Sequence, residues 1–202
     1  MKYDKVFVFS HPRSGTFYIR ELLILNFFPN KSGRWNTHSW IGDELRKRIP
    51  LTFEEGRSKD TAYIYIKRNF MDVAKSIYNI KELFLLEVDS FDSFLKIKYS
   101  DMFKQRRLPV YNLYKYGNLL ENPSTGNIFF ENCNYKPFEF WNKHIKFWEE
   151  QVDDVCIVDY DALINNFYDE MFKVALFLDS NKKSFINIKK QVGWHFDNKK
   201  VY

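Results

Sequence analysis

Three short runs of consecutive apolar residues stand out along the chain, at residues 6–9, 62–66 and 155–158. Each run leads into polar residues and then into a segment whose apolar positions recur at helical spacing. Continuous apolar character is typical of strands that are covered on both faces, as in a parallel sheet. Strands that alternate with helices therefore predict an α/β fold, with a central parallel sheet flanked by helices.

The same reading predicts helices at residues 17–28, 71–80, 82–107, 137–150, 167–178 and 182–190, with a shorter one near 43–48. A loop containing Thr37 and His38 precedes the short helix, and residues 108–135 are predicted to be irregular. Asp161 is expected to cap the turn after the third strand. In a parallel sheet, ligands bind beyond the carboxyl ends of the strands, so the chemistry is expected in the loops after residues 9, 66 and 158.

Composition narrows the class of protein. The 202 residues show no internal repeat and an ordinary balance of 45% apolar and 28% charged residues, which predicts a single domain over residues 1–202. The two cysteines have no metal-ligand spacing, so neither a metal site nor a disulfide framework is expected.

The first apolar run is too short for a signal peptide or a membrane span, which predicts a cytoplasmic protein. The net charge of +5 suits a polyanionic ligand, a nucleic acid or a mildly basic surface alike.

The loop after the first strand has the residue types that a phosphate site needs. Gly15 permits a tight turn, and the start of the next helix supplies free N–H groups with a favourable dipole. Arg13 adds charge and several donors, while Ser14 and Thr16 add hydroxyl groups. A plain strand-to-helix turn with a capping hydroxyl is the alternative. The loop is not a Walker A loop, because it lacks the first Gly and the Lys of GxxxxGK[ST], which weakens a kinase interpretation.

This segment resembles the 5′-phosphosulfate loop, P-[KR]-S-G-T, of sulfotransferases that use 3′-phosphoadenosine-5′-phosphosulfate (PAPS). The resemblance implies the P-loop NTPase-like architecture of that family, with the phosphate-binding loop after the first strand. It also implies that Arg13 contacts the phosphate and the transferring group. The residues implied to cradle the 5′-phosphate are Ser14, Gly15, Thr16 and the backbone of Phe17, and Tyr18 is implied to stack on adenine.

Residues 63–78 resemble a second family motif, roughly Y-x-x-R-[ND]-P-x-D-x-x-x-S, which holds the 3′-phosphate of PAPS. The matching residues are Arg68 and Ser76, whereas Phe70 stands where the family usually has Pro. Taken singly, Arg68 would more readily be a surface cation paired with Asp72, and Ser76 a small residue at a helix contact. Their spacing after the first motif favours phosphate binding.

Two further stretches resemble the family more loosely. Residues 140–148 and 155–163 are similar to a W-x-x-H-x-x-x-W helix followed by a strand that ends in Y-[ED]-D-[LM], which implies that Tyr160 reaches the adenine. His144 on this helix is interpreted as structural. In the tail, Lys189 and Lys190 are similar to a basic pair that meets the 3′-phosphate, although a solvated basic tail is the simpler interpretation.

Sulfuryl transfer needs a group that accepts the acceptor's proton, and histidine suits that role near neutral pH. His38 lies in a segment similar to the family's K-T-H, with Asn36 in place of Lys, and is predicted to be the general base. A carboxylate base remains open, with Asp43 and Glu44 nearby. His11, inside the phosphate loop, is expected to orient that loop.

The resemblance thus implies a sulfotransferase that uses PAPS as donor and releases adenosine 3′,5′-bisphosphate (PAP). The expected partner is a small-molecule or carbohydrate acceptor, with no nucleic acid and no membrane span. Three alternatives stay open, the first being a degenerate relative that binds PAPS without catalysis. A kinase with a degenerate loop would depend on ATP and Mg²⁺, and a nucleic-acid-binding domain would show steep salt dependence.

Overall fold

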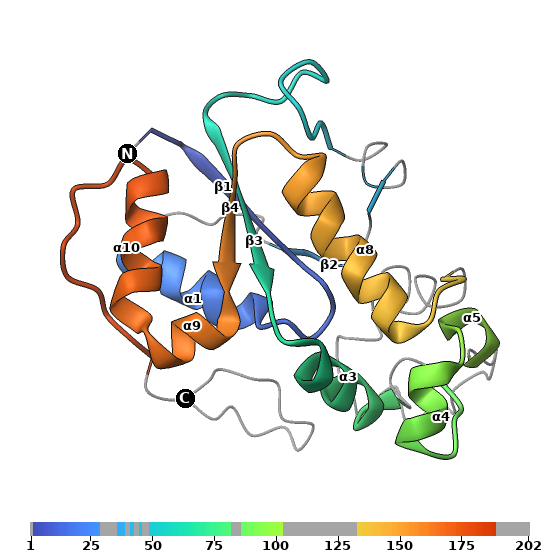
Figure 1. The fold of residues 1–202 in the computed structure, drawn as a ribbon. Coiled ribbons are helices and arrows are strands. Elements are labelled where there is room, and N and C mark those ends of the chain that lie inside the picture. Colours follow the sequence, from blue (N-terminus) through green and yellow to red (C-terminus); the bar gives the residue numbers. More distant parts are fainter. Residues whose placement is uncertain are drawn as a thin grey trace, which may run out of the picture. The chain divides into compact units, whose positions relative to one another are not determined.

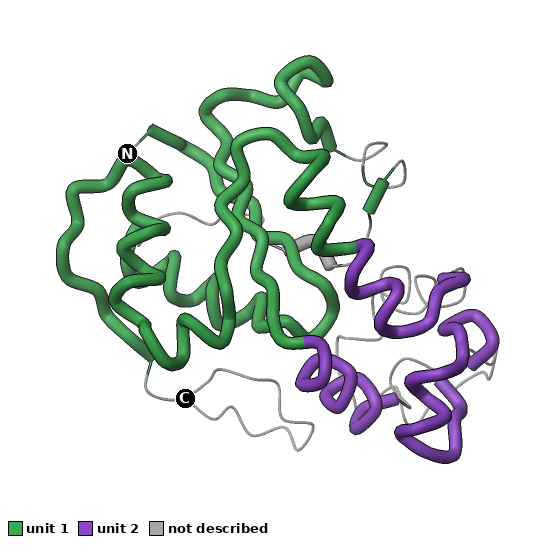
Figure 2. The backbone as a smooth tube through the Cα atoms, in the orientation of Figure 1, with its two compact units in different colours: residues 1–69, 144–193, 201–202 green, residues 70–143, 194–200 purple. Residues whose placement is uncertain are grey.

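The structure is a computed structural model, and it describes residues 2–28, 36–38, 41–42, 45, 49–81, 86–102 and 133–188, with only the backbone for 36–38. The chain divides into two compact units (Figure 2). Unit 1 comprises residues 1–69, 144–193 and 201–202, and unit 2 comprises residues 70–143 and 194–200. That the whole chain acts as a single sulfotransferase domain stays a prediction.

Unit 1 is built on a parallel sheet (Figure 1). Its strands are β1 (Lys5–Ser10), β2 (Asn36–His38), β3 (Thr61–Lys67) and β4 (Val155–Asp159), in the order β2-β1-β3-β4. The three predicted strands are confirmed. Strand β2 lies where a loop was predicted, because three residues without an apolar pattern give no strand signal.

Helices cover both faces of this sheet. Within unit 1, α1 (Thr16–Asn26), α9 (Tyr160–Asn165) and α10 (Phe167–Phe177) lie on one face, and the part of α8 (Pro137–Glu150) from His144 onward lies on the other (Figure 1). Unit 2 contains α3 (Phe70–Tyr78), α4 (Phe91–Lys96), α5 (Tyr99–Met102) and the start of α8. No helix in the described ranges is long and apolar enough to cross a membrane.

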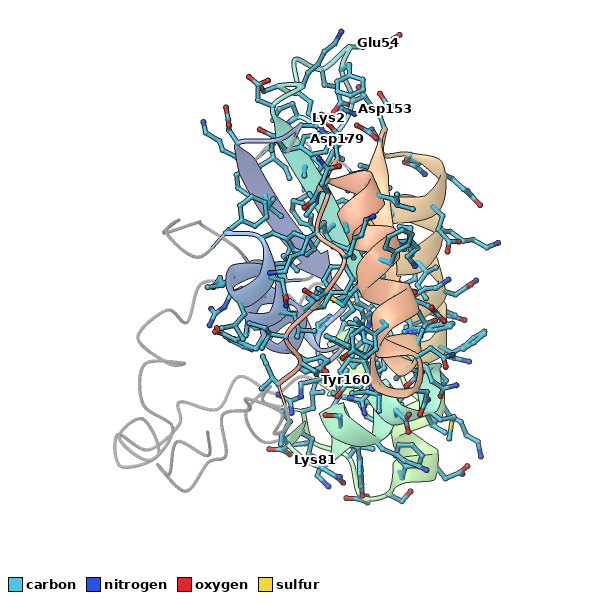
Figure 3. The ribbon with its side chains drawn as sticks, turned by 90° about the vertical axis from the view of Figure 1, so that its left-hand side faces the viewer. Lys2, Glu54, Lys81, Asp153, Tyr160 and Asp179 are labelled. Atoms are coloured by element: carbon cyan, nitrogen blue, oxygen red, sulfur yellow. The ribbon has the colours of Figure 1, made fainter. Side chains whose placement is uncertain are left out.

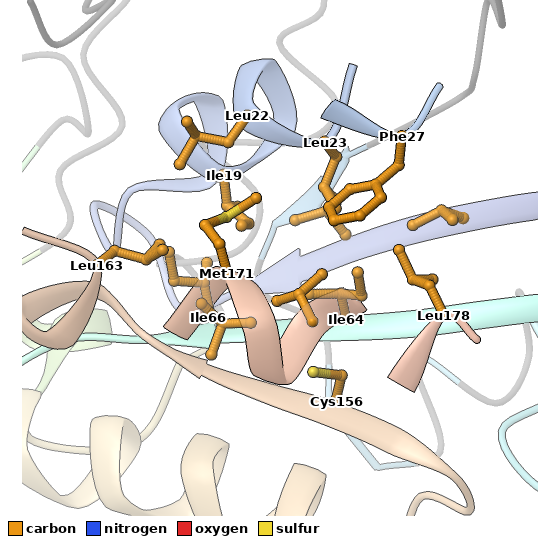
Figure 4. Close-up of a cluster of buried hydrophobic side chains, with 14 of the residues drawn as sticks. Ile19, Leu22, Leu23, Phe27, Ile64, Ile66, Cys156, Leu163, Met171 and Leu178 are labelled. Carbon is orange, nitrogen blue, oxygen red and sulfur yellow. The ribbon is translucent and has the colours of Figure 1, made fainter. Parts of the chain in front are cut away.

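Successive side chains of each strand point to opposite faces of the sheet, so the core consists of two clusters, one on each face. Ala62, Ile64 and Ile66 of β3 join the cluster beneath α1, α9 and α10, which Figure 4 shows. Tyr63 and Tyr65 point to the opposite face and pack with Trp148 of α8. Because both faces are buried, every residue of β3 from Ala62 to Ile66 is apolar or aromatic, which accounts for the continuous apolar run in the sequence.

At the amino-terminal ends of the strands, polar side chains hold the sheet together. Arg57 is only 4% exposed, donates to the backbone oxygens of Asp153, Asp154 and Thr61, and lies over the Tyr63 ring. The Asp154 carboxylate accepts hydrogen bonds from Tyr3 at 2.7 Å and from Lys2 at 3.3 Å. Figure 3 shows Lys2, Asp153 and Asp179 together at this end, with Tyr160 toward the other.

The helix predicted over residues 82–107 is wrong as a single element. In its described part, Ser90 caps a new helix, α4, by accepting from Ser93 N–H, and the extended backbone of Ile97 ends it before α5. Rings of α3, α4 and α5 pack within unit 2, including the pairs Tyr78–Phe94 and Phe94–Tyr99.

The helix predicted over residues 182–190 is also wrong in its described part, because residues 181–188 contain no helix. The buried Asn26 side chain explains why. Its amide donates to the Ile186 backbone oxygen at 2.9 Å, and its oxygen accepts from the Ile186 N–H at 2.7 Å. The segment is thereby bonded to the last turn of α1 instead of to itself, and Phe185 packs against Phe27.

Candidate phosphate-binding site

The loop between β1 and α1 turns through left-handed backbone at two positions. Arg13 has φ 67° and Gly15, the N-cap of α1, has φ 94°. Left-handed backbone costs an arginine about 1–2 kcal/mol, which the surrounding structure must outweigh. Gly15 has no side chain, so the N–H groups in the first turn of α1 have no side-chain acceptor on the N-cap residue. Such a helix start is suited to an anion.

The hydroxyl groups of this loop differ in whether they have a hydrogen-bond partner. Ser10 and Thr16 share a hydrogen bond between their hydroxyls, and both residues are buried. Ser14 is fully buried, and within the described part of the chain its hydroxyl has no hydrogen-bond partner. A buried polar group without a partner costs about 1–3 kcal/mol. The position of Ser14 therefore suits a ligand that brings its own acceptor oxygen.

Two arginines converge at the loop. Arg68, directly after β3, donates a long hydrogen bond of 3.4 Å to the Arg13 backbone oxygen. The Arg13 side chain is exposed, yet partial desolvation, followed by repulsion from Arg68, lowers the pKa of Arg13. Arginine remains charged in proteins, so the loop holds two like charges close together. An anion bound beside them would relieve this repulsion.

Tyr160, the first residue of α9, closes one side of the loop. Its ring is so near Gly15 that a Cβ there would lie 2.3 Å from Tyr160 Cδ2. The Arg68 guanidinium lies 4.5 Å from the centre of the same ring, and the Tyr18 ring meets it edge-on. Tyr160 thus links the two candidate phosphate loops through Gly15 and Arg68.

The loop after β4 differs from its prediction in one detail. Asp159, not Asp161, is the N-cap of α9, since its carboxylate accepts from the N–H groups of Asp161 and Ala162. Asp161 instead accepts from the Asn69 N–H at 3.3 Å. The carboxylate that was predicted to cap the turn after the third strand therefore supports the loop that carries Arg68.

A buried polar cluster lies behind the loop. His11 and His144 are each 1% exposed and their rings meet edge-on, with centres 5.5 Å apart. The Tyr65 hydroxyl is 3.0 Å from His144 Nδ1, and the two rings stack. Burial raises the pKa of Tyr65 far above its ordinary value, although a hydrogen bond from the His11 backbone opposes the shift. Tyr65 was not predicted to be functional, although it stands at the first position of the Y-x-x-R motif that contains Arg68.

Strand β2 places His38 at this end of the sheet. It pairs with β1 so that His38 lies opposite Ser10, the last residue before the loop. The backbone of His38 is therefore at the carboxyl end of the sheet, as a general base would require. The His38 side chain lies outside the described residues, so its role stays a prediction.

The structure brings together most of the predicted loop residues, but not all predicted site residues. Arg13, Ser14, Gly15, Arg68 and Tyr160 meet in unit 1. Thr16 uses its hydroxyl on Ser10, while Phe17 lies under Arg20 on α1.

Other predicted site residues stand apart from this group. Tyr18 is buried in the core, and its hydroxyl donates to Asn187, so stacking of Tyr18 on adenine stays a prediction. Ser76 is on α3 in unit 2, whereas Arg68 is in unit 1, so their joint contact with a 3′-phosphate also stays a prediction. Lys189, Lys190, Asp43 and Glu44 lie outside the described residues. Across the ranges that are described, no group of three or more His, Cys, Asp or Glu side chains is arranged to hold a metal ion.

Comparison with known proteins supports the fold. No family model and no curated protein matches the sequence. Among solved structures, the chain is similar to mouse sulfotransferase SULT7A1 complexed with PAP, with a TM-score of 0.52 and 18% sequence identity. The match covers 89% of this chain and 59% of the mouse chain, so this chain spans less than two thirds of that protein. The likeness confirms the predicted fold class: the chain has a sulfotransferase-like α/β fold.

Proposed function

We propose that this protein is a sulfotransferase that binds PAPS and moves its sulfuryl group to a hydroxyl or amine acceptor. The observation that carries the proposal is the loop itself. A buried Ser14 hydroxyl without a described partner lies at the start of α1, beside the paired charges of Arg13 and Arg68. The likeness in fold to a sulfotransferase complexed with PAP supports this choice over other phosphate ligands.

Each residue of the loop has a definite task in this proposal. The N–H groups at the start of α1 and the Ser14 hydroxyl hold the 5′-phosphate. Arg13 lies where charge grows on the departing phosphate and stabilises it. Arg68 holds the 3′-phosphate, with Ser76 as its predicted second ligand. Anchoring both phosphates aims the sulfuryl group at the acceptor, which removes much of the entropic cost of the reaction.

The proposed reaction is an in-line displacement. The acceptor oxygen or nitrogen forms a new bond to sulfur while the bond between sulfur and the 5′-phosphate oxygen breaks. The electron pair of the broken bond stays on that phosphate, beside Arg13. His38 receives the proton of the acceptor. Its backbone position opposite Ser10 supports this role, because it sets His38 next to the phosphate loop along the edge of the sheet.

The experiment that tests the proposal is a calorimetric titration with PAP, with AMP and with ATP plus Mg²⁺. We expect PAP to bind more tightly than AMP because of its 3′-phosphate, and its affinity to fall by about 10- to 100-fold in Arg68→Ala, since a charged hydrogen bond contributes about 1.5–3 kcal/mol. Arg20→Ala is the matched control. It removes an arginine of α1 whose ion pair is with Glu21, and it should leave affinity unchanged.

The same protein is then assayed for sulfuryl transfer to a panel of phenolic, carbohydrate and amine acceptors. Loss of turnover in His38→Ala with unchanged PAP affinity would support its role as base. A preference for ATP would favour a kinase. Binding of oligonucleotides without any preference for PAP would favour a nucleic-acid-binding domain, and either result would overturn the proposal.

A further inference from the structure

The buried cluster of Tyr65, His144 and His11 has no part in the reaction proposed above. Polar side chains are seldom placed so deeply without a purpose, because each must recover the hydrogen bonds that it loses from water. Tyr65 is fully buried between Trp148 and His144, whose rings both stack against it. A phenylalanine would fill the same space, so the hydroxyl must explain the choice of tyrosine.

The hydroxyl of Tyr65 connects three segments of unit 1. It belongs to β3 and is 3.0 Å from Nδ1 of His144 on α8, whose ring meets the His11 ring of the phosphate loop edge-on at 5.5 Å. A hydrogen bond from the His11 backbone also opposes the rise in the pKa of Tyr65. The Tyr65 oxygen can accept from either neighbour, and we assign its own proton to the bond with His144 Nδ1, so that the oxygen accepts from the His11 N–H. This assignment gives His144 the tautomer with its proton on Nε2.

His11 is the residue through which this contact reaches the loop. Its carbonyl accepts from the Ser14 N–H at 3.2 Å, and its Nδ1 is 2.9 Å from the Pro12 backbone oxygen. Both bonds define the turn that places Arg13 in left-handed backbone. A shift of the His11 backbone would therefore move Arg13 and Ser14 together.

The same strand also positions the second arginine. Tyr65 lies three residues before Arg68, near the carboxyl end of β3, which spans Thr61–Lys67. Strand β3 thus contacts the phosphate loop through the Tyr65 hydroxyl, and it is followed directly by Arg68, the proposed ligand of the 3′-phosphate. The parallel pairing of β1 with β3, which sets Ser10 opposite Ile66, gives the register between the two.

We propose that Tyr65 and His144 are positioning residues, which hold the phosphate loop in its binding conformation through the Tyr65 hydroxyl. The pair contacts no nucleotide. It acts through His11 on Arg13 and Ser14, and so matches the loop to a nucleotide that carries phosphates at both the 5′ and 3′ positions. This inference rests on the proposed function of the site.

The test compares Tyr65→Phe with Tyr63→Phe. Tyr63 is the matched control, because it lies on the same face of β3, is also buried, and donates its hydroxyl to the Pro50 backbone oxygen, away from the loop. Affinity is measured for PAP, for AMP and for adenosine 3′-monophosphate. The free energy of unfolding of each variant is measured alongside.

We expect Tyr65→Phe to bind PAP and AMP about three- to tenfold more weakly, as for the loss of one hydrogen bond, and to bind adenosine 3′-monophosphate as wild type does. Tyr63→Phe should match wild type for all three nucleotides while losing similar stability. Unchanged PAP affinity in Tyr65→Phe, or equal weakening of all three nucleotides, would overturn the positioning role. Wild-type protein that fails to bind PAP would instead overturn the proposed function, and this inference with it.

A second pair of variants keeps the test decisive if Tyr65→Phe folds poorly. His144→Asn keeps an acceptor near the place of Nδ1, whereas His144→Leu has the same size without one. We expect His144→Asn to keep PAP affinity within about twofold and His144→Leu to lose as much as Tyr65→Phe. Equal affinities in these two variants would contradict the proposed bond.

Discussion

Replacing Gly15 by alanine tests whether the loop is built around Tyr160. A Cβ at this position would lie 2.3 Å from Cδ2 and 2.5 Å from Cε2 of the Tyr160 ring, far inside ordinary contact distance. The ring has little room to yield, since it is 5% exposed, lies under Arg68 and packs against Tyr18. The substitution must therefore move either the loop or the ring.

Two separate costs determine the size of the effect. Left-handed backbone at φ 94° costs alanine about 1–2 kcal/mol more than glycine. Overpacking a buried site costs about 1–3 kcal/mol. We expect Gly15→Ala to lower the free energy of unfolding by about 2–5 kcal/mol, a large part of the total for a domain of this size.

The matched control is Gly56→Ala. Gly56 has a similarly positive φ of 87°, yet a Cβ there would meet nothing within 4 Å. It should therefore cost only the backbone share, about 1–2 kcal/mol. Equilibrium urea denaturation of both variants isolates the clash as the difference between them. If Gly15→Ala loses no more stability than Gly56→Ala, the close packing of Tyr160 on the loop is refuted.

A double substitution checks the same contact from the other side. Tyr160→Ala removes the ring, so adding Gly15→Ala to it should cost only the backbone share. The coupling energy between the two sites should then be about 1–3 kcal/mol. PAP affinity should fall in Gly15→Ala beyond any loss of folded protein, because a displaced ring also moves Arg68.

Two other predictions concern groups outside the site. Burial would raise the pKa of Asp154, but hydrogen bonds from Tyr3 and Lys2 outweigh it and lower this pKa below 3.8. The carboxylate therefore stabilises the fold above pH 3.8, and this stabilisation is lost as the pH falls through the lowered pKa. Asp154→Asn should cost about 0.2–1 kcal/mol in urea denaturation at pH 7, and a gap from wild type that persists at pH 2 would contradict the assignment. Burial raises the pKa of the Cys133 and Cys156 thiols to about 12, so at pH 8 roughly one thiol in ten thousand is ionised. A disulfide reagent should therefore label neither cysteine until the protein is unfolded, and rapid labelling of the native protein would refute their burial.

The sequence predicted the sheet well, because its three long strands are buried on both faces and leave a continuous apolar run. It missed β2, whose three residues carry no pattern, although β2 sets His38 opposite Ser10. It also predicted a helix over residues 182–190, where the described part contains none. That segment is held by Asn26, and a contact between residues so distant in the chain leaves no local signal.

The candidate site was predictable in part. Gly15, Ser14 and Arg13 were selected by residue type and spacing, and the structure places them with Arg68. The packing of Tyr160 on Gly15 could not be foreseen, because it joins residues from opposite ends of the sequence. Tyr18 shows the converse problem. An aromatic residue just after a phosphate loop suits adenine and a core equally, and the sequence gives no sign of the burial that Tyr18 has here, while its stacking on adenine stays a prediction.

The parallel pairing of β3 with β4 has a consequence during synthesis. Roughly 90 residues, including most of unit 2, separate the two strands in the chain. At a ribosomal rate of about 5–20 residues per second, β3 is synthesised roughly 5–20 seconds before β4. Throughout that time one edge of the apolar segment Thr61–Lys67 is unpaired, and Tyr160 has not yet arrived to support Gly15. The nascent chain thus carries both arginines of the candidate site before the strand that pairs with β3, and the ring that packs on Gly15, have been made.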